Sequence, residues 1–238
     1  MTFKKYFALF FILIFALPGL PQFFHKNSAN SSSVGKVNNG SIKNAWLLPY
    51  KGDNFKSFST VSYFLLGRAY IHSEIYKTIT ESYAILDKSH PQIKFRYMEC
   101  SKKKGGRARP HHTHQNGTSA DFMTPLLKNN KPYRFYDRIG ILRYGMNFKN
   151  NGRAKINDKI CIDFETMALH ILTLDKTGEK HHVRVKKVIL NTNLSDELFA
   201  TKYGPELKAR GIYFTKNLSP FLNKLHDDHY HIDFEITD

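Results

Sequence analysis

The chain has 238 residues and a formal net charge of +16, and 41% of its residues are hydrophobic and 14% aromatic. This composition excludes a disordered chain, and the surplus of Lys and Arg favours anionic partners. Lys4 and Lys5 precede an apolar run over residues 6–17, which is shorter than the about 20 residues of a spanning helix. The pattern predicts an export signal over residues 1–24, or an uncleaved N-terminal membrane anchor.

The next segment, residues 25–45, is rich in Asn, Ser and Gly. Such a composition predicts a flexible linker. Residues 46–238 are enough for one domain with a core of its own. Cys100 and Cys161 would be able to pair in an exported protein, but their spacing does not bring them together.

Within this domain, hydrophobic periodicity predicts helices and strands in mixed order. The predicted elements, in chain order, are a helix over 68–88, a strand over 92–97, a loop over 101–113, a strand over 119–125, a helix over 164–174, a strand over 180–191 and short helices over 195–203 and 205–210. This order predicts an α+β fold, with a central antiparallel-rich sheet flanked by helices.

Residues 226–236 carry the strongest signal in the chain, because three histidines precede a segment that alternates polar and apolar residues. Alternation at period two predicts a half-buried strand, on which His229 and His231 share one face. His226 lies just ahead of this strand. The opposite face consists of the apolar residues Tyr230, Ile232, Phe234 and Ile236, which are candidates for the core.

A second polar cluster, residues 111–121, contains His114 and Asp121 with the turn residue Gly117 between them. Two imidazoles and one carboxylate, from His114, His231 and Asp121, form a plausible three-ligand site for catalytic zinc. The alternative is two unrelated histidine tracts on exposed loops. The His-Glu-x-x-His motif is absent, which excludes a thermolysin-like helical site.

The stretch from Arg109 to Pro125, with its Thr-His-Gln-Asn-Gly run followed by Asp-Phe-Met, resembles the penicillin-insensitive murein endopeptidases. These zinc peptidases belong to the wider group of lysostaphin, D-Ala-D-Ala peptidases and hedgehog domains. The group's His-x6-Asp motif matches His114 and Asp121, and its terminal His-x-His matches His229 and His231. Residues 66–72 also resemble the start of the family's first helix.

The resemblance implies Zn²⁺ on His114, Asp121 and His231, with His111 as a further ligand or a residue supporting the ligands. It implies that His229 assists catalysis instead of binding the metal. His226 occupies the position three residues before the His-x-His, where it is the candidate base for the attacking water.

We therefore expect a periplasmic zinc endopeptidase that hydrolyses peptidoglycan stem-peptide cross-links, at the D-alanyl–meso-diaminopimelate bond. The basic run over residues 102–109 is either a surface that gathers the anionic cell wall or membrane, or a solvated loop without a specific ligand. The alternatives are a D,D- or L,D-carboxypeptidase, a secreted metal-dependent nuclease, and a wall-binding module without catalysis. Nucleic acid is not the expected partner, because no compact His-Asn-His pattern is present.

Overall fold

The structure is a computed structural model that describes residues 22, 24–109, 111–138 and 140–237. The predicted export segment lies outside the described residues, apart from Gln22 and Phe24. In the part of the chain that is described, no helix is both long enough and apolar enough to cross a membrane.

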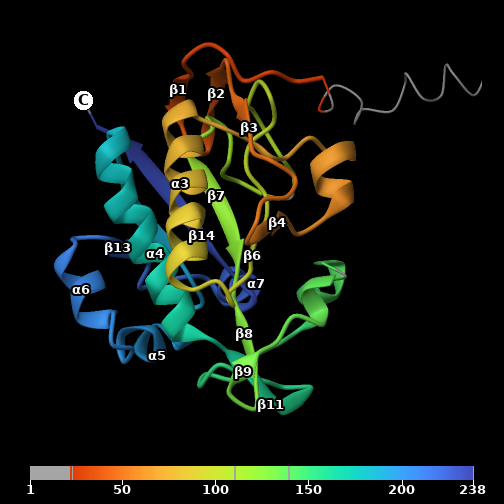
Figure 1. Cartoon of the computed structure of the whole chain (residues 1–238), viewed down its shortest axis with the longest axis vertical. Helices are drawn as coiled ribbons and strands as arrows, with labels where there is room; N and C mark the ends of the chain where they lie inside the picture. Colours follow the sequence, from red (N-terminus) through yellow and green to blue (C-terminus); the bar gives the residue numbers. More distant parts are fainter. Residues whose placement is uncertain (1–21, 23, 110, 139, 238) are drawn as a thin grey trace, which may run out of the picture.

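A six-stranded sheet forms the centre of the fold, and most of its neighbouring strands run antiparallel (Figure 1). The strand order is β13 (Tyr213–Phe214), β12 (Val183–Ile189), β14 (His229–Ile236), β7 (Ser119–Met123), β6 (Phe95–Tyr97) and β4 (Phe55–Ser57). The two outer pairs, β12–β13 and β4–β6, are parallel. The predicted α+β class with an antiparallel-rich central sheet is therefore confirmed.

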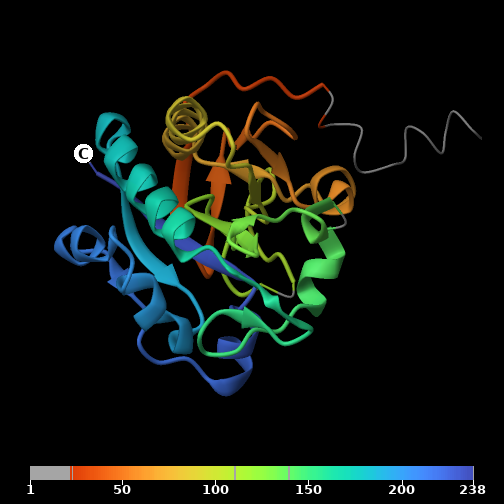
Figure 2. The same ribbon diagram turned by 60° about the horizontal axis from the view of Figure 1, so that its bottom comes forward.

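Two long helices, α3 (Ser73–Ser89) and α4 (Phe164–Gly178), pack side by side on one face of this sheet (Figures 1 and 2). Each begins at a side chain that accepts a hydrogen bond from its first turn, His72 from the Glu74 N–H and Asp163 from the Thr166 N–H. Helix α3 starts later than the predicted residue 68, because Tyr70 and Ile71 pair with another strand instead.

Smaller elements complete the fold. A four-stranded sheet contains β10 (Arg153–Ala154), β11 (Asn157–Ile162), β8 (Leu126–Lys128) and β9 (Lys131–Pro132), and a two-stranded sheet contains β3 (Trp46–Leu47) and β5 (Tyr70–Ile71). The short helices are η1 (Val61–Leu65), η2 (Tyr136–Arg138), η3 (Gly140–Gly145), η4 (Glu179–His181), η5 (Thr192–Leu194), α5 (Ser195–Phe199), α6 (Gly204–Ala209) and α7 (Pro220–Leu225). Cys100 and Cys161 are both free.

The flexible linker expected for residues 25–45 differs from the structure, where β1 (Ser32–Lys36) and β2 (Asn39–Lys43) form a hairpin. This hairpin is attached to the domain, because the Gln115 N–H donates to the Val37 carbonyl and the Ser33 hydroxyl donates to the Asn116 carbonyl. Asn, Ser and Gly are typical both of linkers and of tight hairpin turns, so composition alone did not separate the two.

The sequence predicted a half-buried final strand, but every residue from His229 to Phe234 is buried. Its apolar face packs with Phe122 into the core beneath α3 and α4. Its polar face is covered by the loop after β6, which carries the histidines of the 111–121 cluster. Both faces of this central strand are therefore shielded from water.

His170 of α4 lies among the core side chains and is completely buried. Its ring lies 5.2 Å from the Tyr83 ring and 4.9 Å from the Phe95 ring, and its Nδ1 lies 2.6 Å from the Tyr230 hydroxyl. Burial lowers the pKa of His170 from 6.5 to about 3. A protonated imidazole is therefore strongly disfavoured in the folded chain.

This histidine is expected to make the protein less stable in mild acid. The unfolded chain takes up the proton near pH 6.5, and the folded chain takes it up only near pH 3. The stability of the folded chain is therefore unaffected by this histidine above pH 6.5 and falls as the pH decreases from 6.5 towards 3. The free energy of unfolding should fall by up to about 1.4 kcal/mol per pH unit from this residue. The free energy of unfolding should be measured by urea denaturation between pH 4 and 7 for the wild type and His170→Gln. It should change less steeply with pH in the variant. Equal slopes would contradict the assignment.

Candidate metal centre

The central strand pair brings together the two polar motifs of the sequence. In the antiparallel register of β7 and β14, Asp121 lies directly opposite His231. The His231 Nδ1 atom lies 2.7 Å from Asp121 Oδ1, although the two residues are 110 positions apart in the chain. Because side chains alternate along a strand, His229 and Asp233 share this face with His231.

The loop ahead of β7 turns His114 inward onto the same face. His114 is buried and adopts a left-handed backbone conformation, with φ of 63°. Such a conformation costs about 1–3 kcal/mol for a residue other than glycine, and it recurs at functional sites. Gly117, with φ of 77°, closes the turn where a Cβ atom would lie 2.3 Å from Ile42 Cδ1. The loop therefore needs glycine at this point.

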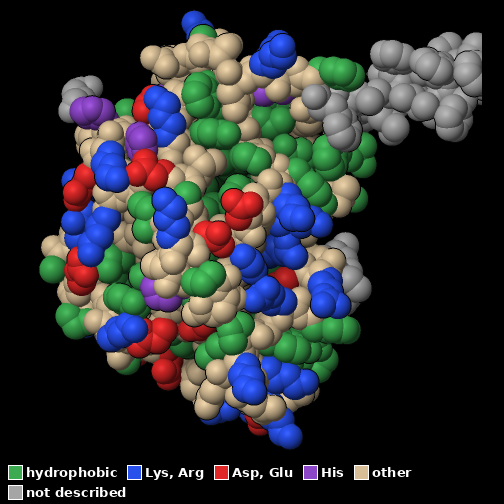
Figure 3. Space-filling view, viewed as in Figure 1, with side chains coloured by type: hydrophobic (Ala, Val, Ile, Leu, Met, Phe, Trp, Pro, Cys, Tyr) green, Lys and Arg blue, Asp and Glu red, His purple; other side chains and the backbone are tan. Residues whose placement is uncertain are grey.

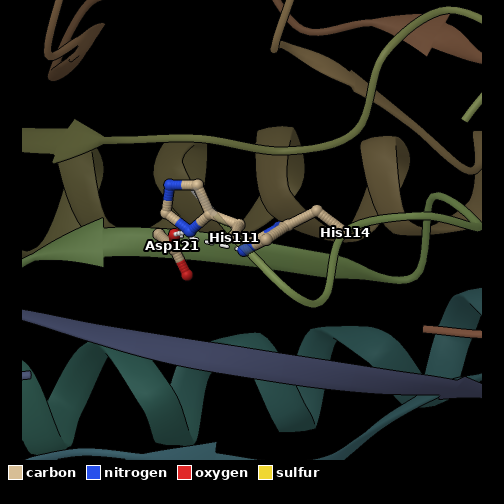
Figure 4. Close-up of side chains that lie close together, drawn as sticks. All are labelled: His111, His114 and Asp121. Atoms are coloured by element: carbon tan, nitrogen blue, oxygen red, sulfur yellow. Dashed lines mark ion pairs between the residues drawn. The ribbon is translucent and has the colours of Figure 1, made fainter. Parts of the chain in front are cut away.

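Three side chains form a group that could hold a metal ion: His111, His114 and Asp121. One potential ligand atom from each lies within 4.8 Å of the others (Figure 4). His114 Nε2 lies 3.2 Å from Asp121 Oδ2, yet it is buried and has no hydrogen-bond partner among the described residues. An unpaired buried imidazole nitrogen facing a carboxylate fits a metal ligand, because both groups donate electron pairs to the same space.

A carboxylate behind the group fixes the orientation of His111. Glu99 Oε2 lies 2.6 Å from His111 Nε2 and 2.7 Å from an Arg68 guanidinium nitrogen, and Glu99 Oε1 accepts a hydrogen bond from Ser62. This contact occupies Nε2 and leaves His111 Nδ1 on the side of Asp121, 3.8 Å from its Oδ2. A carboxylate on the outer nitrogen is the usual support of a metal-binding histidine.

His231 is held between two carboxylates. Its Nδ1 contacts Asp121, and its Nε2 lies 2.7 Å from Asp233 Oδ1, which also accepts a hydrogen bond from Ser119. Both ring nitrogens are therefore engaged, and a metal ligand role requires His231 to exchange one of these contacts. Its role as a ligand stays a prediction.

The charges of this cluster support one another. Burial alone would lower the pKa of His231, but its hydrogen bonds to Asp121 and Asp233 outweigh burial and raise it to about 9. Burial alone would raise the pKa of Asp121, but His114 and His231 hold it well below its usual value. Asp121 is therefore an anion that can offer an oxygen to a metal ion, whereas His231, which the two carboxylates hold protonated near neutral pH, would have to lose a proton before it could bind one.

His226 and His229 form a second pair beside the cluster. Their ring centroids lie 4.9 Å apart, with His226 at the end of α7 and His229 at the start of β14. Burial and the neighbouring His229 lower the pKa of His226 to about 4. Burial also acts to lower the pKa of His229, but the Asp228 carboxylate, 2.6 Å from its Nδ1, raises it overall. The two imidazoles therefore favour opposite protonation states.

A buried arginine supports the turn that carries this pair. Arg143 is completely buried, and its guanidinium donates to the Thr124 hydroxyl at 2.8 Å and to the Asp228 carbonyl at 3.3 Å. Thr124 binds the same carbonyl through its own N–H at 3.1 Å. These contacts fix the backbone that precedes His229.

All six residues predicted from the sequence thus lie on or beside one sheet face. The two sequence motifs did not indicate Glu99, Asp228, Asp233 or Arg143, which contact the histidines or hold their backbone. Asp233 lies two residues beyond His231 on the same strand face, so the alternation contained a signal for it. Glu99 and Arg143 belong to no motif. His112, beside the cluster in the chain, is exposed. No family model matches the chain, and no curated protein matches it.

Proposed function

We propose that this protein is a zinc-dependent endopeptidase of peptidoglycan, which hydrolyses stem-peptide cross-links at D-alanyl–meso-diaminopimelate bonds. The observation that carries the proposal is the meeting of His111, His114 and Asp121 beside His231 on one buried sheet face. These residues come from the two segments that resemble murein endopeptidases. Cysteine or serine nucleophiles are not needed for such chemistry.

When bound, zinc would supply a Lewis acid that polarises a scissile carbonyl and makes water acidic enough to attack near neutral pH. The ligands would be His114 and Asp121, joined by His231 and His111. Glu99 and Asp233 would orient the two latter imidazoles through hydrogen bonds. These outer contacts should set how tightly the ion is held.

The two remaining histidines would move protons. His226, with its low pKa, is neutral near pH 7 and can accept the proton of the attacking water. His229, whose pKa is raised, can carry a proton to the leaving amine. Opposite shifts in neighbouring titratable groups are a common basis for dividing acid and base roles.

The basic run ahead of the site fits an anionic substrate. Lys102, Lys103, Lys104, Arg107 and Arg109 are all exposed. We propose that this run draws the protein to carboxylates of the cell wall or to phosphates of a membrane surface. Peptidoglycan stem peptides would then reach the histidine cluster, and nucleic acid is not the proposed partner.

Digestion of purified sacculi tests this function. The metal-loaded protein should convert cross-linked dimeric muropeptides to monomers without release of free D-alanine, as measured by liquid chromatography and mass spectrometry. A chelator should stop the reaction, and added zinc should restore it. β-Lactams should not inhibit it, because they trap a nucleophilic serine that this mechanism does not use.

The alternatives give different products. Free D-alanine with unchanged dimers would favour a carboxypeptidase on the same site. Degradation of plasmid DNA that is lost in His114→Ala would favour a nuclease. Binding to sacculi without any product would favour a wall-binding module.

We further propose that the protein works in the periplasm, exported by its N-terminal segment and retained by it if that segment is not cleaved. A reporter enzyme that functions only outside the cytoplasm should be active when it is fused after residue 238. Activity of a cytoplasm-specific reporter at the same position would contradict the proposal, because peptidoglycan lies outside the inner membrane.

A further inference from the structure

The β4–β6 edge of the central sheet is lined by cationic side chains, none of which belongs to the histidine cluster. A cavity of about 270 Å³ opens there. Five cationic side chains line it, together with two carboxylates from Asp53 and Asp137; the cations are Lys51, Lys56, Lys94, Arg96 and Arg134. Figure 3 shows Lys and Arg side chains gathered on this face, between β4 and the η2–η3 segment.

The backbone forces three of these cations into one row. Lys56 of β4 is the register partner of Arg96 on β6, and Lys51 is bridged to Lys56 on its other side. Paired residues on neighbouring strands point to the same face, and like charges in such positions destabilise a sheet. The row therefore carries an electrostatic cost that a bound anion would remove.

Arg96 is half-buried, and yet its guanidinium lacks a hydrogen-bond or ion-pair partner within the described residues. Burial and the charge of Arg134 lower its pKa, while Asp137 acts in the opposite direction. By contrast, Lys94 contacts Asp87 at 3.2 Å and Lys56 lies over the Tyr50 ring. The cavity thus presents an unpaired fork of N–H donors.

Asp137 offsets only part of this positive charge. It lies against Arg143 on its other side, with 3.8 Å between Asp137 Oδ1 and Arg143 Nε, and burial raises its pKa despite the three nearby guanidinium groups. Five cations and two carboxylates leave the cavity lining with a surplus of three positive charges. Arginine forks bind tetrahedral oxyanions in two-point contacts that lysine cannot reproduce.

We infer that this cavity binds a phosphate group, with Arg96 and Arg134 donating hydrogen bonds to it and Lys51 and Lys56 balancing its charge. The group is either free phosphate or the terminal phosphomonoester of a larger molecule. The inference does not depend on the peptidase activity, because the cavity lining includes none of the residues of the histidine cluster.

The test is a titration of the full chain with inorganic phosphate at constant ionic strength, with chloride as the balancing anion. Arginine side-chain Nε–Hε signals in the NMR spectrum report binding at each guanidinium. Arg96→Gln should raise the Kd at least about tenfold, because a hydrogen bond to a charged group is lost. Arg96→Lys keeps the charge but not the two-point contact, and it should also weaken binding. Arg134→Gln changes an exposed arginine outside the sheet, and it should weaken binding without disturbing the sheet.

The matched control is Arg184→Gln, which removes one half-exposed arginine from β12, outside the cavity. Its Kd should stay within about twofold of the wild type, because screening limits distant charges. Equal weakening in Arg184→Gln and Arg96→Gln would overturn the inference, as would an Arg96→Gln Kd equal to that of the wild type.

Two further arms separate the remaining cases. The Kd of phosphate should be the same with and without a chelator, and the same in Asp121→Asn as in the wild type. Loss of phosphate binding in either case would assign the phosphate to the metal centre and overturn the inference. Glycerol 3-phosphate should compete with inorganic phosphate if the natural ligand is a phosphomonoester. Binding of inorganic phosphate alone would identify the free ion as the ligand.

Discussion

Replacement of Asp121 or His114 by alanine is expected to abolish metal binding and hydrolysis together. Asp121 contacts both a strand histidine and a loop histidine, His231 at 2.7 Å and His114 at 3.2 Å. A metal ion contributes several kcal/mol to stabilisation of a hydrolytic transition state, and about 4 kcal/mol corresponds to about a thousandfold in rate. Muropeptide release should fall by at least that factor.

Metal content by mass spectrometry of the purified chain supplies the direct measurement. The wild type should carry about one zinc ion per chain. The matched control is His112→Ala, which removes an exposed histidine next to the cluster and should keep both metal and activity. Full occupancy in His114→Ala and Asp121→Ala would show that these residues are not ligands. His231→Ala, examined in the same way, would settle whether that imidazole leaves Asp233 to bind the ion.

Removal of the proton-transfer histidines is expected to separate catalysis from metal binding. His226→Ala and His229→Ala should retain the metal but lose about 10²–10⁴-fold in turnover, the usual contribution of general acid–base groups. Asp228→Asn should reduce turnover to a smaller degree, because the carboxamide keeps a contact to His229 Nδ1 but not the charge that raises the pKa of His229.

Rates and metal content should be measured on the same preparations, with His112→Ala again as the control. A near-normal rate in either alanine variant, with metal present, would remove that histidine from the proposed mechanism. Loss of metal in His229→Ala would instead make His229 a ligand. The Asp228→Asn result distinguishes a charge effect from simple positioning, because only the charge effect shifts the pH–rate profile.

The features that the sequence predicted well are those with a local signature. Alternation over residues 229–236 identified a strand and the face it would turn to Asp121, because side-chain direction on a strand depends only on position. Helix α4 began at the predicted residue 164, where Asp163 supplies an N-terminal cap. Six candidate site residues lay in two short motifs, which the central strand pair joined.

Features that depend on contacts between distant segments were not predictable in this way. Glu99 supports His111 only because β6 lies beside β7, and its sequence neighbourhood resembles that of any other carboxylate. Arg143 is buried beneath the Asp228 carbonyl, whereas arginine is ordinarily a surface residue. The hairpin of residues 32–43 was mistaken for a linker because its turn-forming residues are also linker residues.

The position of β14 has a consequence for how the protein folds. Its two neighbours in the sheet are β12 and β7, and its contact with β7 closes a loop of about 110 residues. Pairings between such distant segments form slowly, because chain entropy is lost before the contacts are gained. Without β14, the chain can bring together His111, His114 and Asp121, but not His226, His229 and His231. The full proposed ligand set, which includes His231, should therefore be present only when the central sheet is complete, and partly folded chains should hold a metal ion less tightly.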